Sequence, residues 1–121
     1  MLYVNQPVVI GSVRAELTTP QVLLLGGMLK DEETQRLLSQ HLRDLHAHLV
    51  ASKMTSLVVD VRGLNFVNSS ALRLFVDLAS RADAYKLIFN IDTSITWHRL
   101  SFSVLQALAP HRVELRDGVA A

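Results

Sequence analysis

From residue 21 onward, short apolar runs alternate with longer amphipathic segments, and this alternation limits the possible folds more than any other feature of the chain. Runs typical of strands occupy residues 21–25, 56–61, 86–91 and 112–115. An earlier alternating run at residues 13–17 is placed to form a hairpin with residues 21–25. Strands separated by helices pair in parallel through right-handed crossovers, with the helices covering the sheet. The pattern predicts an α/β fold, with a mixed, mostly parallel sheet of four to five strands and about three main helices.

Each amphipathic segment has apolar residues at the three-and-four spacing of one helical face. The first helix is predicted to begin after the acidic residues 31–33 and to bury a face made of Leu38, Leu42, Leu45 and Leu49. The second is predicted to follow the turn at residues 68–70, to run to about residue 83 and to bury Leu72, Phe75, Leu78 and Ala79. Its outer face carries Arg73 and Asp77, which are spaced to form an ion pair. The third carries one apolar stripe, made of Trp97, Leu100, Val104 and Leu108.

Size and composition favour a single domain spanning residues 1–121, with residues 117–121 as a frayed tail. Half of the residues are apolar, 19% are charged and the formal net charge is +1, which argues against disorder and against a nucleic-acid partner. There are no cysteines, no signal-like N-terminus and no apolar run long enough to cross a bilayer. We therefore expect a cytoplasmic protein without membrane insertion.

The sequence contains no motif that predicts catalysis, a cofactor or a metal. His41, His46 and His48 share a predicted helix, but no two of them are four residues apart, as a helical zinc site would require. The serines lack the Gly-x-Ser-x-Gly elbow of hydrolases, and the glycine pair at residues 26–27 lacks the spacing of a nucleotide-binding loop. We expect no enzyme activity, no cofactor and no metal, and a small enzyme is the least favoured alternative.

The most informative stretch is residues 58–75, in which a buried strand stops at an Arg62-Gly63 turn and Asn68-Ser69-Ser70 opens the second helix. One interpretation is ordinary capping, with Asn68 accepting hydrogen bonds from backbone N–H groups of the first turn. The other is a phosphorylation site, because the free N–H groups and partial positive charge of a helix N-terminus stabilise a phosphate. Spacing alone favours the capping interpretation, because such caps are common at helix starts.

This stretch resembles the signature of STAS domains, the family that includes the bacterial anti-sigma factor antagonists. The resemblance rests on residues 63–66, the polar residue Asn68 and the paired hydroxyls of Ser69 and Ser70 before an apolar helix. It extends to residues 25–29, where the family has a Gly-x-Leu segment at a strand end. Residues 68–73, together with residues 92–97, are most similar to a regulator subgroup tied to biofilm and signalling switches.

The resemblance implies a partner switch, in which Ser69 is the phosphoacceptor and Ser70 the second choice. It implies protein partners, namely a serine kinase or anti-sigma factor and a PP2C-type phosphatase, and leaves a weak homodimer open. The partner-binding residues that it implies surround this loop: Leu64, Phe66, Asn68, Ser69, Ser70, Arg73 and Val76. The alternative within the same fold is an unphosphorylated binding or scaffold module, or a lipid-transport accessory.

Three residues depart from the usual pattern of the antagonists. Asn68 replaces an aspartate, Lys30 stands near a position that is often acidic, and Ala71 replaces a glycine. The first two changes remove negative charge near the phosphoacceptor, which either favours the phosphorylated form or indicates that a different kinase, or none, acts here.

Overall fold

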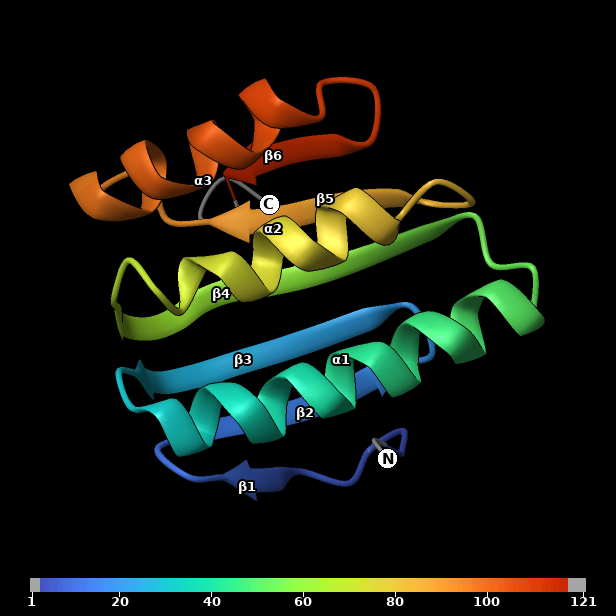
Figure 1. Ribbon diagram of the computed structural model, residues 1–121, viewed down its shortest axis with the longest axis horizontal. Helices are drawn as coiled ribbons and strands as arrows, with labels where there is room; N and C mark the ends of the chain where they lie inside the picture. Colours follow the sequence, from blue (N-terminus) through green and yellow to red (C-terminus); the bar gives the residue numbers. More distant parts are fainter. Residues whose placement is uncertain (1–2, 118–121) are drawn as a thin grey trace.

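The computed structural model describes residues 3–117, which form three helices and one sheet of six strands in chain order (Figure 1). The strands are β1 (Val8–Ile10), β2 (Val13–Thr19), β3 (Val22–Leu29), β4 (Ser56–Val67), β5 (Lys86–Ile91) and β6 (Val113–Asp117). The helices are α1 (Glu32–Ala51), α2 (Leu72–Arg81) and α3 (Thr96–Leu108). The α/β class and the three helices agree with the prediction.

The sheet differs from the prediction in its size and in the share of parallel pairs. It has six strands rather than four or five, because the short segment Val8–Ile10 adds an edge strand. The β1–β2 and β2–β3 pairs are antiparallel, and the three pairs from β3 to β6 are parallel. At the other edge, Asp117 belongs to β6 instead of a frayed tail, and residues 118–121 lie outside the described part.

Two strands continue through glycines at which the sequence predicted that they would end. Gly26 of β3 lies opposite Gly63 of β4, and the pairing register shifts on both sides of this position. A Cβ atom on Gly63 would lie 3.1 Å from the Leu25 carbonyl oxygen, so β3 leaves little room for a side chain at Gly63. These glycines therefore mark an irregularity within the sheet, not a turn. As a result, β4 carries the chain directly to Asn68.

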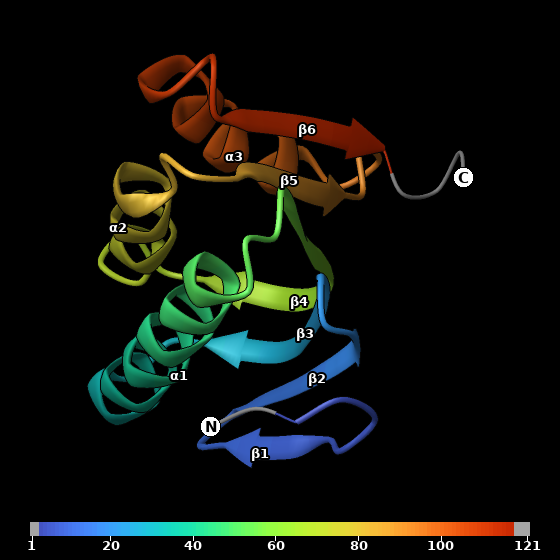
Figure 2. The same ribbon diagram turned by 90° about the vertical axis from the view of Figure 1, so that its right-hand side faces the viewer.

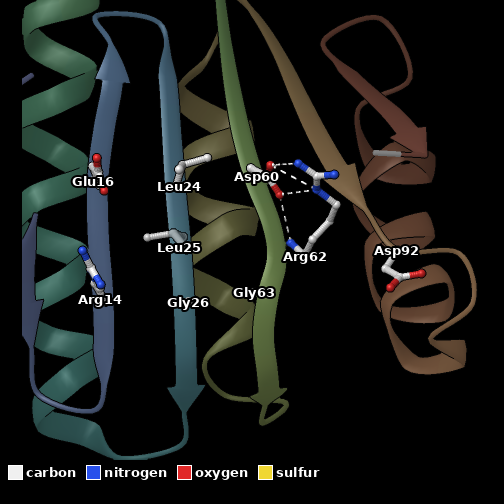
Figure 3. A pocket seen from close by; sticks show the side chains of 9 residues that line it. All are labelled: Arg14, Glu16, Leu24, Leu25, Gly26, Asp60, Arg62, Gly63 and Asp92. Atoms are coloured by element: carbon white, nitrogen blue, oxygen red, sulfur yellow. Dashed lines mark hydrogen bonds and ion pairs between the residues drawn. The ribbon is translucent and has the colours of Figure 1, made fainter. Parts of the chain in front are cut away.

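All three helices lie on one face of the sheet (Figure 2). Because the strand order advances in one direction from β3 to β6, successive right-handed crossovers place their helices on the same side. The opposite face carries a hollow of about 660 Å³ lined by charged residues that include Arg14 and Glu16 (Figure 3). An ion pair of 2.6 Å joins Arg62 to Asp60 there. The helices thus cover one face of the sheet and leave this hollow on the other.

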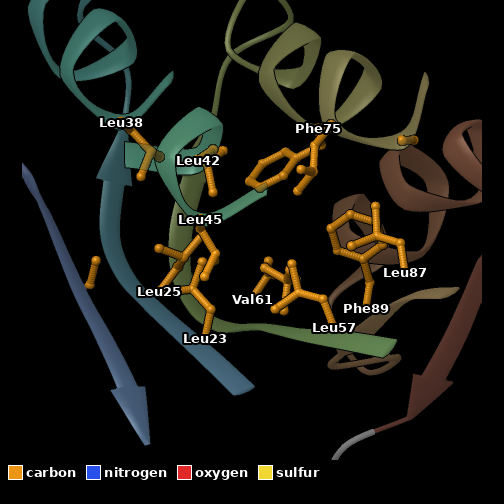
Figure 4. Packing of buried hydrophobic residues seen from close by; sticks show 14 of the residues in the cluster. Leu23, Leu25, Leu38, Leu42, Leu45, Leu57, Val61, Phe75, Leu87 and Phe89 are labelled. Carbon is orange, nitrogen blue, oxygen red and sulfur yellow. The ribbon is translucent and has the colours of Figure 1, made fainter. Parts of the chain in front are cut away.

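The core fills the space between the helices and the sheet (Figure 4). The predicted leucine face of α1 is buried, and the three rings of Phe75, Phe89 and Phe102 contact one another with centroids 5.2 to 5.6 Å apart. Helix α2 buries Phe75, Leu78 and Ala79 as predicted, whereas Leu72 is only half-buried. It ends at Arg81, two residues earlier than predicted.

Helix α3 turns a different face toward the core from the one that its apolar stripe suggested. The buried residues are His98, Phe102 and Leu105. Three residues of the stripe are exposed: Leu100 (62%), Val104 (49%) and Leu108 (64%). Because His98, Phe102 and Leu105 also recur at helical spacing, periodicity alone does not show which of the two faces contacts the sheet.

Candidate functional site

The residues singled out by the sequence lie at the edge of the sheet where the parallel strands end and their helices begin (Figure 1). In parallel α/β folds, ligand and partner sites concentrate at this edge. Residues 68–71, here called the Asn68 loop, connect the end of β4 to the start of α2. The loop therefore occupies the position in the fold at which a binding site is expected.

Asn68 holds this loop in place with both atoms of its side-chain amide. Its Nδ2 donates to the Lys30 carbonyl at 2.9 Å, and its Oδ1 accepts from the Ala71 backbone N–H at 2.8 Å. The same Oδ1 accepts from Ser70 Oγ at 3.0 Å and from Gln35 Nε2 at 3.3 Å. Asn68 thus links β4, the β3–α1 connection, α1 and the turn before α2.

These contacts provide a physical reason for asparagine in place of aspartate. The Lys30 carbonyl needs a hydrogen-bond donor, and an ionised carboxylate has none to offer. They also confirm the capping interpretation for Asn68, with one correction: α2 begins at Leu72 rather than at the serines, and Asn68 caps the turn that precedes it.

Replacing Asn68 with alanine is expected to lower the free energy of unfolding by about 1–2 kcal/mol, because the cap and the contact with Lys30 are both lost. Asn68→Asp should cost less, since a carboxylate still accepts from the Ala71 N–H. Urea unfolding followed by circular dichroism measures both changes. Asn65→Ala is the matched control, because Asn65 is exposed and its side chain has no hydrogen bond with the described residues. Equal stability of Asn68→Ala and Asn65→Ala would contradict the assignment.

The two serines of the loop are in different environments. The Ser70 hydroxyl donates to Asn68 and accepts from Gln35 Nε2 at 3.3 Å. Ser69 is exposed, and its hydroxyl has no hydrogen-bond partner within residues 3–117. In that same part of the chain, the backbone N–H groups of Ser69 and Ser70 also have no acceptor. Ser69 therefore combines an accessible hydroxyl with nearby free donors.

An exposed apolar pair lies close to the loop in sequence and on neighbouring strands. Phe66 is 45% exposed, and its register partner on β3, Met28, is 41% exposed. The two residues are register partners, so they stand next to each other on paired strands. Phe66, one of the predicted partner-binding residues, is therefore accessible at the surface, whereas Met28 was not selected from the sequence.

The prediction that Leu64 binds a partner is wrong for its side chain, which is completely buried in the core and cannot contact a partner. Its backbone carbonyl lies 3.0 Å from Nε2 of the buried His98. The other ring nitrogen, Nδ1, accepts from the Asp92 backbone N–H at 3.3 Å. In this arrangement Nδ1 is the acceptor and Nε2 donates to the Leu64 carbonyl. His98 thus ties the end of β4 to the start of α3.

The charged residues around the loop are arranged differently from the prediction. Arg73 is exposed, but Asp77 pairs with Arg81 at 3.1 Å instead of with Arg73. Asp31 caps α1, and hydrogen bonds from the Thr34 backbone N–H and hydroxyl hold the pKa of this carboxyl below its usual value. Val76, the remaining predicted contact, is half-buried and lines a hollow of about 500 Å³ between α2 and α3.

A shallow groove lies beside Ser70, between α1 and α2. The described residues that line it include no histidine that could act as a general base. Within residues 3–117, no cluster of histidine, aspartate and glutamate side chains is arranged to hold a metal ion. None of the helices in this part of the chain has the length and apolar character needed to span a membrane.

Comparison with known proteins does not assign a family: no family model matches the chain, and no curated protein is significantly similar to it.

Proposed function

We propose that this protein is a phosphorylation-controlled, protein-binding regulator of the STAS type, with Ser69 as its phosphoacceptor. The observation that carries the proposal is the exposed Ser69 hydroxyl, which forms no hydrogen bond within residues 3–117 and stands beside free backbone N–H groups. A kinase can reach such a hydroxyl without breaking the loop. Phosphorylation of Ser70 would first have to break its hydrogen bonds with Asn68 and Gln35.

The expected effect of phosphorylation is a change of surface rather than of fold. A phosphate adds a charge of about −1.5 to −2 and several strong acceptor oxygens. The start of α2 tolerates this charge, and the exposed side chain of Arg73 follows one helical turn later. For a partner that covers Phe66 and Met28, however, the same charge must be desolvated next to apolar surface. Phosphorylation is therefore expected to release such a partner.

The partners that the STAS resemblance implies are a serine kinase, which can itself be an anti-sigma factor, and a PP2C-type phosphatase that reverses the modification. The second candidate is an unphosphorylated binding module of the same fold. It is favoured by the cap that Asn68 provides, which explains the polar residues of the loop without any modification. The two candidates differ in whether Ser69 ever carries a phosphate.

Co-expression with a cognate serine kinase is expected to add one phosphate, detected by intact-mass spectrometry. Ser69→Ala should abolish the mass increase, and Ser70→Ala, the matched control, should retain it, because only Ser69 offers a free hydroxyl. If Ser69→Ala still gains a phosphate while Ser70→Ala does not, the site assignment is wrong. If the parent chain, without either substitution, gains no phosphate, the unphosphorylated binding module becomes the better interpretation.

A further inference from the structure

A groove of about 470 Å³ runs between α1 and α2, which lie side by side on the covered face of the sheet (Figure 1). It begins beside Ser70 and continues along both helices. Arg36 and Arg43 contribute to it from α1, and Arg73 contributes from α2. These three side chains define the arginine groove.

Arg36, Arg43 and Arg73 are exposed and form no ion pair within residues 3–117. By contrast, Arg81 is paired with Asp77 on α2, so this carboxylate of the groove is already neutralised. The other carboxylate, Glu32, lies in the first turn of α1, where the helix dipole favours a negative charge. The groove therefore carries more positive than negative charge. Its three guanidinium groups can donate hydrogen bonds to an external partner.

The spacing of the arginines indicates what kind of anion fits. Arg36 and Arg43 are seven residues apart on α1, which places them on one face about 10 Å apart along the helix axis. Carboxylates spaced along a peptide can therefore bind the two arginines separately. Guanidinium groups bind carboxylates through paired hydrogen bonds of favourable geometry. We infer that the arginine groove binds an acidic segment of a protein partner. This inference does not depend on phosphorylation of Ser69.

The test is a titration of the isotopically labelled, unphosphorylated protein with a synthetic glutamate-rich helical peptide, followed by NMR. Saturable shifts are expected for backbone resonances of α1 and α2 that face the groove. The double variant R36E/R43E should weaken binding about tenfold or more, and R73E should also weaken it, because charge-assisted hydrogen bonds are lost and repulsion replaces them. The glutamine version of the peptide is expected not to bind.

The matched controls are R99E on α3 and R14E on the uncovered face of the sheet, both exposed positions outside the groove. They are expected to leave the affinity within about twofold of the parent value, since distant surface charges are screened by salt. The proposal is overturned if R99E or R14E weakens binding as much as R36E/R43E does. It is also overturned if the peptide shows no saturable binding, or if inorganic phosphate gives the same shifts with equal affinity.

Discussion

His98→Leu is expected to lower the free energy of unfolding by about 2–5 kcal/mol, because one buried and one part-buried backbone group lose their partner together. The imidazole is fully buried, with Nε2 3.0 Å from the Leu64 carbonyl and Nδ1 3.3 Å from the Asp92 nitrogen. Leucine fills much of the same space but can neither donate to Leu64 nor accept from Asp92. Each unsatisfied group costs about 1–3 kcal/mol.

Urea unfolding at constant pH measures this loss, with His111→Leu as the matched control. His111 is exposed, so the same substitution there should change the stability by about 0.5 kcal/mol or less. If both variants are equally stable, the two hydrogen bonds contribute nothing to folding. Because Leu64 precedes the Asn68 loop on β4, NMR resonances of residues 65–71 should shift in His98→Leu and remain unchanged in His111→Leu.

The parts of the fold that the sequence predicts well are those decided by local pattern. The leucine face of α1 has no apolar competitor on that helix, so its burial follows from spacing alone. Helix α3 is different, because its core face includes a histidine while three residues of the competing apolar stripe are exposed. Burial of His98 becomes favourable only when Leu64 and Asp92 supply hydrogen-bond partners, and Leu64 is 34 residues away in the chain.

The same distinction applies to the candidate site. Asn68 and Ser69 could be selected because a helix start has a local signature. Lys30 and Gln35 are 38 and 33 residues from Asn68, and they contact it only because β3 pairs with β4 and α1 begins at the same edge of the sheet. Met28 is exposed beside Phe66 for the same reason. No local pattern gives this information before the strand register is known.

Gly27→Ala is expected to be one of the most damaging single substitutions, with a loss of about 2–6 kcal/mol from backbone strain and overpacking together. Gly27 has a φ of +99°, which side chains rarely permit. A Cβ atom there would lie 2.4 Å from the Ser12 carbonyl oxygen. That oxygen is fixed, since it accepts a hydrogen bond of 3.1 Å from the Met28 backbone N–H. The strain cannot be relieved by moving a flexible side chain.

Gly26→Ala is the matched control, because it makes the same chemical change one residue earlier on β3. Its Cβ atom would meet the Gly63 carbonyl oxygen at 3.6 Å, an ordinary contact, so a loss of about 1 kcal/mol or less is expected. Urea unfolding compares the two, and equal losses would mean that conformation at Gly27 is not the cause. The strain that alanine introduces at Gly27 is also expected to displace Lys30, which follows the end of β3. The Lys30 carbonyl accepts a hydrogen bond from Asn68, so the Asn68 loop should shift with it. Gly27→Ala should therefore alter the environment of Ser69 at urea concentrations where the chain is still folded, and Gly26→Ala should not.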